Sequence, residues 1–325
     1  MNTIALVIPY FGKFNNYFHL WMESAKCNKT IDFHIYTDQQ VEASGNIKVH
    51  QTTLSKISDL TVRKLSEILK DNNIYNMKAW GGVKSPYKLC DYKPIYGLIF
   101  EEDLQDYDFW GHCDVDLIFG DIRRFITDDI LNKYDRILSR GHFSLYRNNK
   151  ESNLTFLLSH NNKVGIPSFE TVYTSDESYS FDEWPGLSRI WRALKNDRLY
   201  DEIVFDDIAV LKGHFVSSQK AKTLDIGVSN AIFEFGEGHL YRYFLRRGKN
   251  VKQETMYAHF QKRPMEVGSI DANHYLIVPN RFIEFQEPTI QVLKKFGKTK
   301  YLYLHAIKIR MRNLNRKLKH LLKRI

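Results

Sequence analysis

The sequence has few of the features that mark disulfide-rich, secreted or membrane-spanning proteins. It holds only three cysteines, Cys27, Cys90 and Cys113, which are far apart and odd in number. This usage excludes a disulfide framework and shows no metal-type pairing, so we expect a reduced, cytosolic protein in which all three cysteines pack among apolar residues. No apolar run approaches the roughly 18 residues of a membrane span. The stretch MNTIALVIPYFGKF lacks the pattern of a signal peptide.

Acidic residues are missing from the end of the chain. After residue 288 there are 12 Lys and Arg but no Asp or Glu, whereas the remainder holds 35 Lys and Arg against 38 Asp and Glu. The formal net charge of +9 therefore comes from this tail, and the body of the chain is mildly acidic. An acidic body argues against a broad nucleic-acid surface, so we expect no nucleic-acid partner.

The basic tail also carries an apolar stripe. Seven apolar residues recur at spacings of three and four: Leu304, Ile307, Met311, Leu314, Leu318, Leu321 and Ile325. This spacing predicts an amphipathic helix with cations on its other faces. Such a helix is typical of an anchor on an anionic membrane surface, the role we expect for residues 301–325. The stripe also fits docking on the body, pairing with a second copy or nucleic-acid binding, so an oligomer is one alternative.

The body of the chain reads as an α/β protein. Its composition, 43% hydrophobic and 14% aromatic, is sufficient for a sizeable core in a chain of 325 residues. A short apolar run at Ile4–Phe11 is typical of a buried parallel strand, and DFHIYTD (Asp32–Asp38), which ends on an acid, and IKVHQTT indicate a second and a third strand. We expect helices at Phe18–Lys26, Thr61–Leu69 and Lys93–Glu102. This alternation predicts a mostly parallel sheet flanked by helices. From residue 149 to residue 207 the sequence indicates loops and short elements.

Candidate ligand-binding residues follow three of the predicted strands, where ligands bind in open α/β sheets. Pro9 and Tyr10 end the first strand, and Asp38 ends the second. Asp114 and Asp116 lie in FWGHCDVDLIFGD between two apolar runs, and burying bare carboxylates is costly unless they are paired or bound to a metal. Divalent Mg²⁺ or Mn²⁺ favours such oxygen ligands. The alternative is that each Asp only caps a turn.

Six stretches taken in order resemble a known enzyme group: IALVIPYFGKF, FHIYTD, SPYKLCDYKPIYG, FWGHCDVDLIFGDI, RGHFSLYRN and YAHFQKR. Together they resemble GT-A nucleotide-sugar glycosyltransferases with a DxD motif, and more narrowly the bacterial enzymes that build capsular or O-antigen polysaccharide. The resemblance covers roughly residues 1 to 265. It implies a Rossmann-like GT-A sheet, a nucleotide-diphosphate sugar donor with UDP as the expected nucleotide, and Mn²⁺ or Mg²⁺.

The resemblance also implies roles for single residues. Asp116 would bind the metal directly, and Asp114 would contact the ribose, the metal or a metal-bound water. Pro9, Tyr10 and Asp38 would lie around the base of the nucleotide. In YAHFQKR, His259 would complete the metal site, and Lys262 or Arg263 would hold the diphosphate. The alternative for His259 is a partly buried imidazole that is simply hydrogen-bonded.

The segment SPYKLCDYKPIYG brings Lys, Asp and Tyr together before a predicted helix, with Pro94 in its first turn. Lys88, Asp91 and Lys93 are candidates to line the donor site, where a lysine would neutralise phosphate. The alternative is the start of a capped helix with solvated charges.

The stretch FDEWPG is the candidate for the acceptor and the chemistry. An inverting transferase needs a carboxylate base, and Asp182 or Glu183 would serve, with Trp184 stacking on a sugar face. The alternative is an acidic turn held by its aromatic neighbours. Asp206 and Asp207 are weaker rivals, and His142, with Arg147 and Asn148, faces the donor or acceptor on the resemblance alone.

These observations together predict a GT-A domain over residues 1–288, with a donor part to about 125 and an acceptor part after it, followed by the helical tail. The expected function is transfer of a sugar from a UDP-sugar to a lipid-linked glycan at the inner face of the plasma membrane. A metal-dependent phosphoester hydrolase or nucleotidyltransferase, and a non-enzymatic membrane-binding module, are the alternatives.

Overall fold

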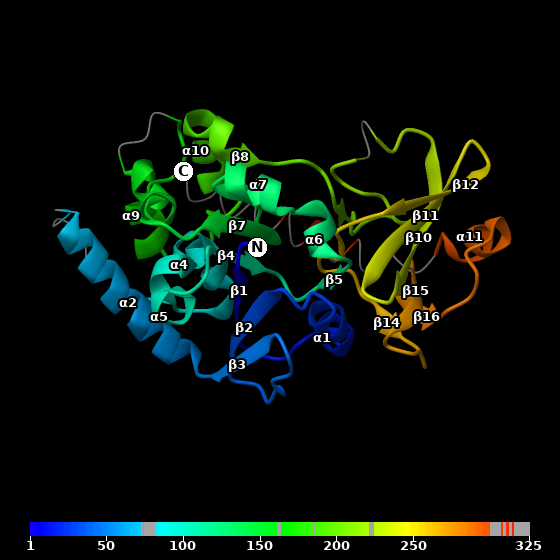
Figure 1. Ribbon diagram of the computed structural model, residues 1–325, viewed down its shortest axis with the longest axis horizontal. Helices are drawn as coiled ribbons and strands as arrows, with labels where there is room; N and C mark the ends of the chain where they lie inside the picture. Colours follow the sequence, from blue (N-terminus) through cyan, green and yellow to red (C-terminus); the bar gives the residue numbers. More distant parts are fainter. Residues whose placement is uncertain are drawn as a thin grey trace. The chain divides into compact units, whose positions relative to one another are not determined.

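The computed structural model describes residues 1–72, 74, 82–160, 164–184, 186–220, 224–299, 307, 310, 311 and 314. They form a mixed α/β protein, as expected, with the elements ordered as in Figure 1. The chain divides into two compact units that alternate along the sequence. Unit 1 comprises Met1–Phe14, Asn28–Val115 and Ile126–Glu202, and unit 2 comprises Asn15–Cys27, Asp116–Phe125 and the described residues from Ile203 on. The expected division into a donor-binding part, to about residue 125, and an acceptor-binding part after it describes ligand binding, so it stays a prediction.

Unit 1 is built on a seven-stranded sheet with the order β3-β2-β1-β4-β7-β6-β8. The pairs β3–β2, β2–β1 and β1–β4 are parallel. The pairs β4–β7 and β7–β6 are antiparallel, and β8 is parallel to β6. The strands are β1 (Ile4–Tyr10), β2 (Ile31–Thr37), β3 (Ile47–Gln51), β4 (Phe109–Cys113), β6 (Arg136–Arg140), β7 (Phe143–Arg147) and β8 (Leu199–Tyr200). The first three strands thus confirm the predicted parallel strands. In β1 the residues from Ile4 to Ile8 are all buried, which is why the run lacks polar alternation.

Unit 1 also contains helices, several of which pack apolar residues against this sheet. They are α2 (Leu54–Asp71), α3 (Leu89–Tyr92), α4 (Tyr96–Ile99), α5 (Glu101–Leu104), α7 (Asp128–Lys133), α8 (Lys150–Asn153), α9 (Phe169–Thr174) and α10 (Leu187–Leu194). The core joins Ala5 and Val7 of β1 to Leu65 of α2, Tyr96 of α4 and Trp191 of α10. As expected, short elements and loops make up most of the segment from residue 149 to residue 207.

Two predicted helix boundaries were wrong. The helix expected at Thr61–Leu69 begins at Leu54, because Thr53 caps it by accepting a hydrogen bond from the Lys56 N–H at 3.3 Å. The third strand therefore ends before this cap, at Gln51. The segment expected as one helix at Lys93–Glu102 is helical, but it is divided into three short helices, at Lys93–Ile95, Tyr96–Ile99 and Glu101–Leu104, with Pro94 in the first turn as predicted.

Unit 2 contains two sheets. The larger has the order β12-β11-β10-β15-β16-β14, and it is antiparallel except for the β14–β16 pair. Its strands are β10 (Val228–Gly236), β11 (His239–Arg246), β12 (Lys249–Glu254), β14 (Glu266–Val267), β15 (His274–Val278) and β16 (Arg281–Glu284). Unit 2 also contains the helices α1 (Phe18–Lys26), α6 (Ile122–Phe125) and α11 (Ile290–Phe296). Of these, α1 was predicted, whereas the antiparallel sheet was not.

The smaller sheet of unit 2 joins three short strands from distant parts of the chain. They are β5 (Leu117–Phe119), β13 (Tyr257–His259) and β9 (Asp206–Asp207), with β13 in the middle. In this register His259 pairs with Leu117 on one side and with Asp207 on the other. The sheet therefore brings the residue after the DVD motif next to YAHFQKR.

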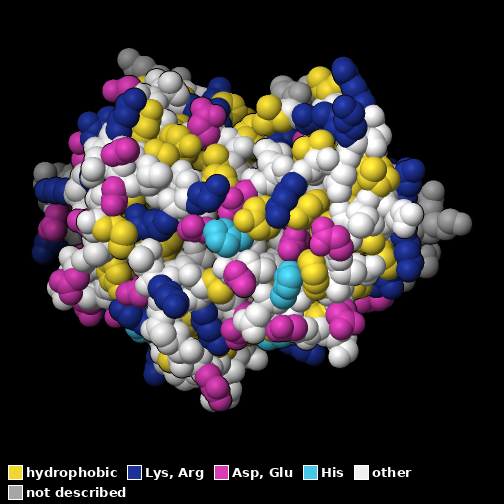
Figure 2. All heavy atoms as spheres, turned by 45° about the vertical axis from the view of Figure 1, so that its right-hand side comes forward, with side chains coloured by type: hydrophobic (Ala, Val, Ile, Leu, Met, Phe, Trp, Pro, Cys, Tyr) yellow, Lys and Arg dark blue, Asp and Glu magenta, His cyan; other side chains and the backbone are white. Residues whose placement is uncertain are grey.

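Three further expectations concern surfaces. Cys113 is buried and Cys90 is partly buried, but Cys27 is exposed, so the prediction that all three cysteines pack inside was wrong for Cys27, which follows the last turn of α1. Acidic and basic side chains are interspersed on the face in Figure 2. None of the helices in the described part of the chain combines the length and apolar character needed to cross a membrane.

The predicted tail helix lies largely outside the described residues. Ile307, Arg310, Met311 and Leu314 are described, and all four are helical and exposed. The helix over residues 301–325 and its membrane role stay predictions.

Candidate functional site

The carboxyl ends of the parallel strands in unit 1 gather several of the predicted residues. Tyr10 is level with Thr37 in the register of β1 and β2, and β4 ends at Cys113, directly before Asp114. Asp38 accepts a hydrogen bond from the Gly12 N–H at 3.2 Å, which ties the loop after β1 to the end of β2. Gly12 has a φ of 100°, a backbone conformation that suits glycine. The ends of β1, β2 and β4 therefore lie at one edge of the sheet, as the sequence predicted.

The side chains at this edge have defined surroundings. The Tyr10 ring stacks on Phe14 at a centroid distance of 4.6 Å. Hydrogen bonds from the Gln39 side chain and from Gly12 lower the pKa of Asp38, which favours a charged, exposed carboxylate. An aromatic pair next to a carboxylate has the chemistry to bind a nucleobase and a ribose hydroxyl. Pro9 precedes them in β1 and is partly buried.

Lys93 is a buried cation that links two carboxylates in unit 1. Its ammonium group lies 2.7 Å from Asp114 Oδ1 and 3.4 Å from Asp182 Oδ2, and it donates to the Gly141 carbonyl at 2.7 Å. Burial alone disfavours the charge of Lys93, but Asp114 and the other anions around it hold its pKa well above the usual value. Lys93 therefore holds the carboxylate of Asp114, the first of the DVD motif, and connects it to Asp182 in the FDEWPG stretch.

The two candidate bases have opposite environments. The Asp182 side chain is only 3% exposed, and burial raises its pKa to about 7 even though Lys93 acts in the other direction. Glu183 is exposed, and its side chain lies against Gly141 so closely that a Cβ there would clash with the Glu183 carboxylate. Trp184 is 58% exposed, near the guanidinium groups of Arg189 and Arg192. Among the described residues of this stretch, Glu183 and Trp184 are thus the exposed ones.

Lys88 and Asp91 make contacts that the sequence did not indicate. The Asp91 carboxylate is fully buried and accepts hydrogen bonds from the N–H groups of Tyr179 and Phe181 at 2.9–3.1 Å. Lys88 bonds to Asp91 at 2.9 Å and also to the carbonyls of Val172 and Glu177. The pair therefore holds the segment that leads into Asp182. A direct contact of either residue with a donor stays a prediction.

His142, Arg147 and Asn148 also have defined places in unit 1. The His142 carbonyl accepts a hydrogen bond from the Asp114 N–H at 3.1 Å, so its backbone helps to fix the DVD motif. Arg147 forms an ion pair with Asp135 at 2.7 Å, and Asn148 donates to the carbonyls of Leu104 and Tyr107. Arg147 and Asn148 thus stabilise the C-terminal end of β7 through these contacts.

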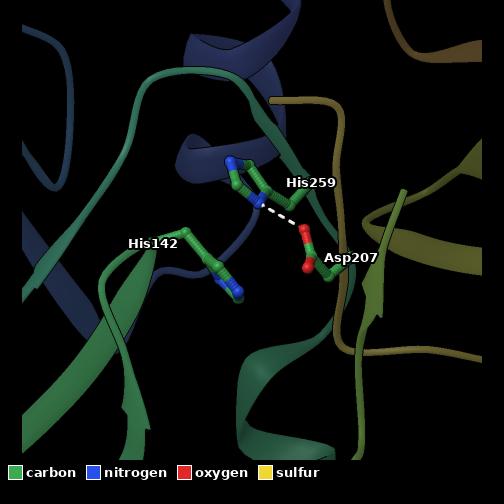
Figure 3. Close-up of side chains that lie close together, drawn as sticks. All are labelled: His142, Asp207 and His259. Atoms are coloured by element: carbon green, nitrogen blue, oxygen red, sulfur yellow. Dashed lines mark hydrogen bonds and ion pairs between the residues drawn. The ribbon is translucent and has the colours of Figure 1, made fainter. Parts of the chain in front are cut away.

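In unit 2, His259 lies between two carboxylates. Its Nε2 is 3.3 Å from Asp116 Oδ1, and its Nδ1 is 2.9 Å from Asp207 Oδ1. Figure 3 shows the contact between His259 and Asp207 as a dashed line. Burial by itself would lower the pKa of His259, but Asp116 and Asp207 raise it to about 10. Asp207 therefore orients the ring so that Nε2 is presented to Asp116.

The backbone around His259 reinforces this geometry. The Phe260 N–H donates to the Asp116 carbonyl at 3.0 Å, and the Gln261 side chain donates to Asp207 Oδ1 at 2.8 Å. Next to His259, Lys262 is exposed, whereas Arg263 is buried and bonds to Asn280 and to the Ala209 carbonyl. Of the two cations proposed for the diphosphate, Lys262 is the one open to solvent.

A buried ion-pair network holds the strand that carries Asp207. The neighbouring Asp206 is fully buried and lies 3.0 Å from Lys220 and 3.3 Å from Arg242, which itself binds Asp225 at 2.7 Å. Although burial would raise it, these cations lower the pKa of Asp206. Asp206 is thus held in the interior by cations, whereas its neighbour Asp207 contacts His259.

The donor set Asp116 and His259 fits a divalent metal ion. A carboxylate oxygen and an imidazole nitrogen are ligands of Mn²⁺, and a ligating histidine commonly donates its second ring N–H to a carboxylate, as His259 does to Asp207. The chain crosses from unit 1 to unit 2 between Val115 and Asp116, inside the DVD motif. The motif thus supplies one carboxylate to the Lys93 cluster and one to His259.

The chain belongs to DUF6625, a family of unknown function. The family matches residues 6–286, which include every site residue discussed above and stop before α11 and the tail. A search of curated proteins found no match. The site must therefore be interpreted from its own chemistry.

Sequence reasoning considered Asp207 only as a weak rival base and did not predict its contact with His259. Its pairing with His259 depends on the β9–β13 register across more than fifty residues, and no local pattern encodes this. The linking role of Lys93 was missed for the same reason. The doublet DD in DEIVFDDIAV, within a short apolar run, was the only available signal.

Breaking the buried Lys88–Asp91 pair should destabilise unit 1. We expect Asp91→Ala to lower the free energy of unfolding by about 3–5 kcal/mol, because it leaves a buried ammonium without its partner. Urea unfolding followed by circular dichroism measures this change. The matched control is Asp176→Ala, which removes the exposed Lys84–Asp176 pair and should leave the midpoint unchanged. Equal effects of both variants would contradict the burial argument.

The raised pKa of Asp182 predicts a pH-dependent stability. Its ordinary pKa is 3.8, and the folded value is about 7, so the folded state holds this proton more tightly than the unfolded state. The resulting stabilisation is complete below pH 3.8 and is lost as the pH rises through 7. Relative to Asp182→Asn, the wild type should lose about 3 kcal/mol between pH 5 and pH 8. Parallel pH dependences in urea unfolding would contradict a neutral, buried Asp182.

Proposed function

We propose that this protein is a metal-dependent glycosyltransferase that uses a nucleotide-diphosphate sugar, with UDP as the nucleotide. The single observation that carries this proposal is the placement of His259 between Asp116 and Asp207, at 3.3 Å and 2.9 Å. An oriented imidazole and a carboxylate at the end of a DVD motif are suited to a hard divalent cation that binds a diphosphate. Mn²⁺ or Mg²⁺ would supply the charge that stabilises the departing diphosphate.

The sheet of unit 1 supports a GT-A type of fold for the donor site. Four parallel strands in the order β3-β2-β1-β4 end at one edge, and the DVD motif directly follows the last of them. Tyr10 and Asp38 at this edge are the proposed contacts for the base and the ribose. Lys262, which is exposed next to His259, is the proposed cation for the diphosphate.

For an inverting transfer, we assign the general base to Glu183. The acceptor oxygen forms a bond to the anomeric carbon, the bond from that carbon to the diphosphate oxygen breaks, and the acceptor proton passes to the base. A base must reach the hydroxyl, and Glu183 is exposed whereas Asp182 is buried beside Lys93. Trp184, also exposed, offers an apolar ring for a sugar face.

The proposed acceptor is a lipid-linked glycan, and the proposed location is the cytoplasmic face of a membrane. The support is the basic, acid-free tail, with the exposed and helical Ile307, Met311 and Leu314 on its apolar stripe. A basic amphipathic segment binds anionic lipid through its cations and its apolar face. The contribution of this tail to membrane binding is measured together with the surface described in the next subsection.

The metal site is tested by calorimetric titration with UDP in the presence and absence of Mn²⁺. Wild-type protein should bind UDP only with Mn²⁺, and Asp116→Ala or His259→Ala should abolish this metal-dependent binding, because each removes a ligand. Asp207→Asn should weaken Mn²⁺ binding by about 10- to 100-fold, because it releases the ring of His259. Asp271→Ala, at an exposed turn of unit 2, is the control and should bind as wild type does.

Two results would contradict the donor-site proposal. One is UDP binding that is equally tight without Mn²⁺. The other is UDP binding that survives both Asp116→Ala and His259→Ala. Metal-dependent binding of a different nucleotide would change only the assignment of the base.

The base assignment is tested by transfer kinetics. Glu183→Gln should lower kcat by about 10²- to 10⁴-fold, the usual contribution of a general base, while Mn²⁺-dependent UDP binding stays as in wild type. Trp184→Ala should instead raise the KM for the acceptor. If Glu183→Gln transfers sugar at the wild-type rate and Asp182→Asn does not, the base is Asp182.

A further inference from the structure

Unit 2 exposes two large apolar side chains just before β10. Leu224 is 53% exposed and Ile226 is 72% exposed. Side chains of this size leave solvent favourably when a partner covers them, by about 25 cal/mol for each Å² of apolar surface. Their neighbours determine what kind of partner would fit.

Three cations lie at the end of the neighbouring hairpin. The turn between β11 and β12 lies beside these apolar residues, because Val228 pairs with Arg246 and Arg246 pairs with Lys249. Arg246 also donates to the Leu224 carbonyl at 2.6 Å. We call this surface the sheet tip and define it as Leu224, Ile226, Arg246, Arg247 and Lys249, all of which are exposed.

The acid within the tip does not offset these cations at the surface. Asp225 lies between the two apolar residues, but its side chain is only 6% exposed and forms a two-point ion pair with Arg242 at 2.7 Å and 2.9 Å. Arg242 is buried as well. The sheet tip therefore presents apolar side chains flanked by positive charge.

We propose that the sheet tip docks on an anionic lipid membrane. Leu224 and Ile226 would enter the boundary between headgroups and acyl chains, and Arg246, Arg247 and Lys249 would contact lipid phosphates. A second copy of the chain related by a two-fold axis would bring like charges together, which disfavours a homodimer through this face. Nucleic acid would satisfy the cations and leave the apolar side chains in water. This inference rests on the membrane location in the proposed function and adds a second contact surface to it, but it does not depend on the metal site.

The test is sedimentation of the full-length protein with lipid vesicles. Wild type should sediment with phosphatidylcholine vesicles that contain about 30% phosphatidylglycerol and much less with pure phosphatidylcholine, because anionic lipid attracts the cations. Arg247→Gln combined with Lys249→Gln should weaken this binding by about 30-fold, from about 1 kcal/mol for each cation. Ile226→Ser should weaken it by about tenfold or more through lost apolar burial.

Matched changes in unit 1 control for general effects. Leu194→Ser, which alters another exposed leucine, and Lys150→Gln should sediment as wild type does. Deleting residues 301–325 measures the share of the tail, and the tip changes should weaken binding further in that background. Equal melting temperatures by circular dichroism show that the tip variants are folded.

Three results would overturn the proposal. The first is tip variants that sediment like wild type, which would leave membrane binding to other parts of the chain. The second is loss of single-stranded DNA binding in the same variants without any change in vesicle binding, which would assign the tip to nucleic acid. The third is a dimer in sedimentation velocity that dissociates on Ile226→Ser while vesicle binding is unchanged, which would assign the tip to a second copy.

Discussion

The position of His259 between two carboxylates is the constraint on which the proposed chemistry depends. A buried imidazole with Asp116 on one nitrogen and Asp207 on the other has both its orientation and its charge determined by them. Without a metal, the two anions favour the imidazolium. A divalent cation would replace that proton, because it needs the neutral ring as a ligand. The three-stranded sheet β5-β13-β9 exists where these residues meet, and its register places each of them.

The Lys93 cluster in unit 1 is likewise a buried group held by oppositely charged neighbours. There a buried cation has two carboxylates around it, and it keeps one carboxylate of the DVD motif in place while the other belongs to unit 2. Buried charges of this kind are costly unless they are paired and hydrogen-bonded. Lys88 with Asp91 and Asp206 with Lys220 repeat this arrangement in the segments that support the two clusters. Pairing of buried charges thus recurs around each carboxylate of the motif.

Local patterns in the sequence were sufficient for the first part of the fold and for the residue types of the site. An unbroken apolar run predicted β1, a second short strand-like segment predicted β2, and their common edge followed from the geometry of parallel strands. The DVD motif was recognised by its two carboxylates after a strand and His259 by the resemblance to GT-A glycosyltransferases, and the structure brings Asp116 and His259 together. The start of α2 was missed because the cap at Thr53 was read as part of a strand.

Other features depend on contacts that sequence separation conceals. Asp207 faces His259 across 52 residues, and Asp91 binds the Tyr179 N–H across 88 residues. A carboxylate in a short run looks the same whether it binds a metal, orients a histidine or accepts hydrogen bonds from a distant backbone. The antiparallel sheet of unit 2 was also missed, although the turns at FGEGH and RRGK between alternating segments are hairpin signals.

The most direct test of the metal site is anomalous diffraction at the manganese edge from crystals grown with UDP and Mn²⁺. The predicted result is a manganese peak bonded to a carboxylate oxygen of Asp116 and to Nε2 of His259, with Asp207 still hydrogen-bonded to Nδ1. A manganese ion bound elsewhere, with His259 retaining its contacts to both carboxylates, would contradict the proposed role of these three residues.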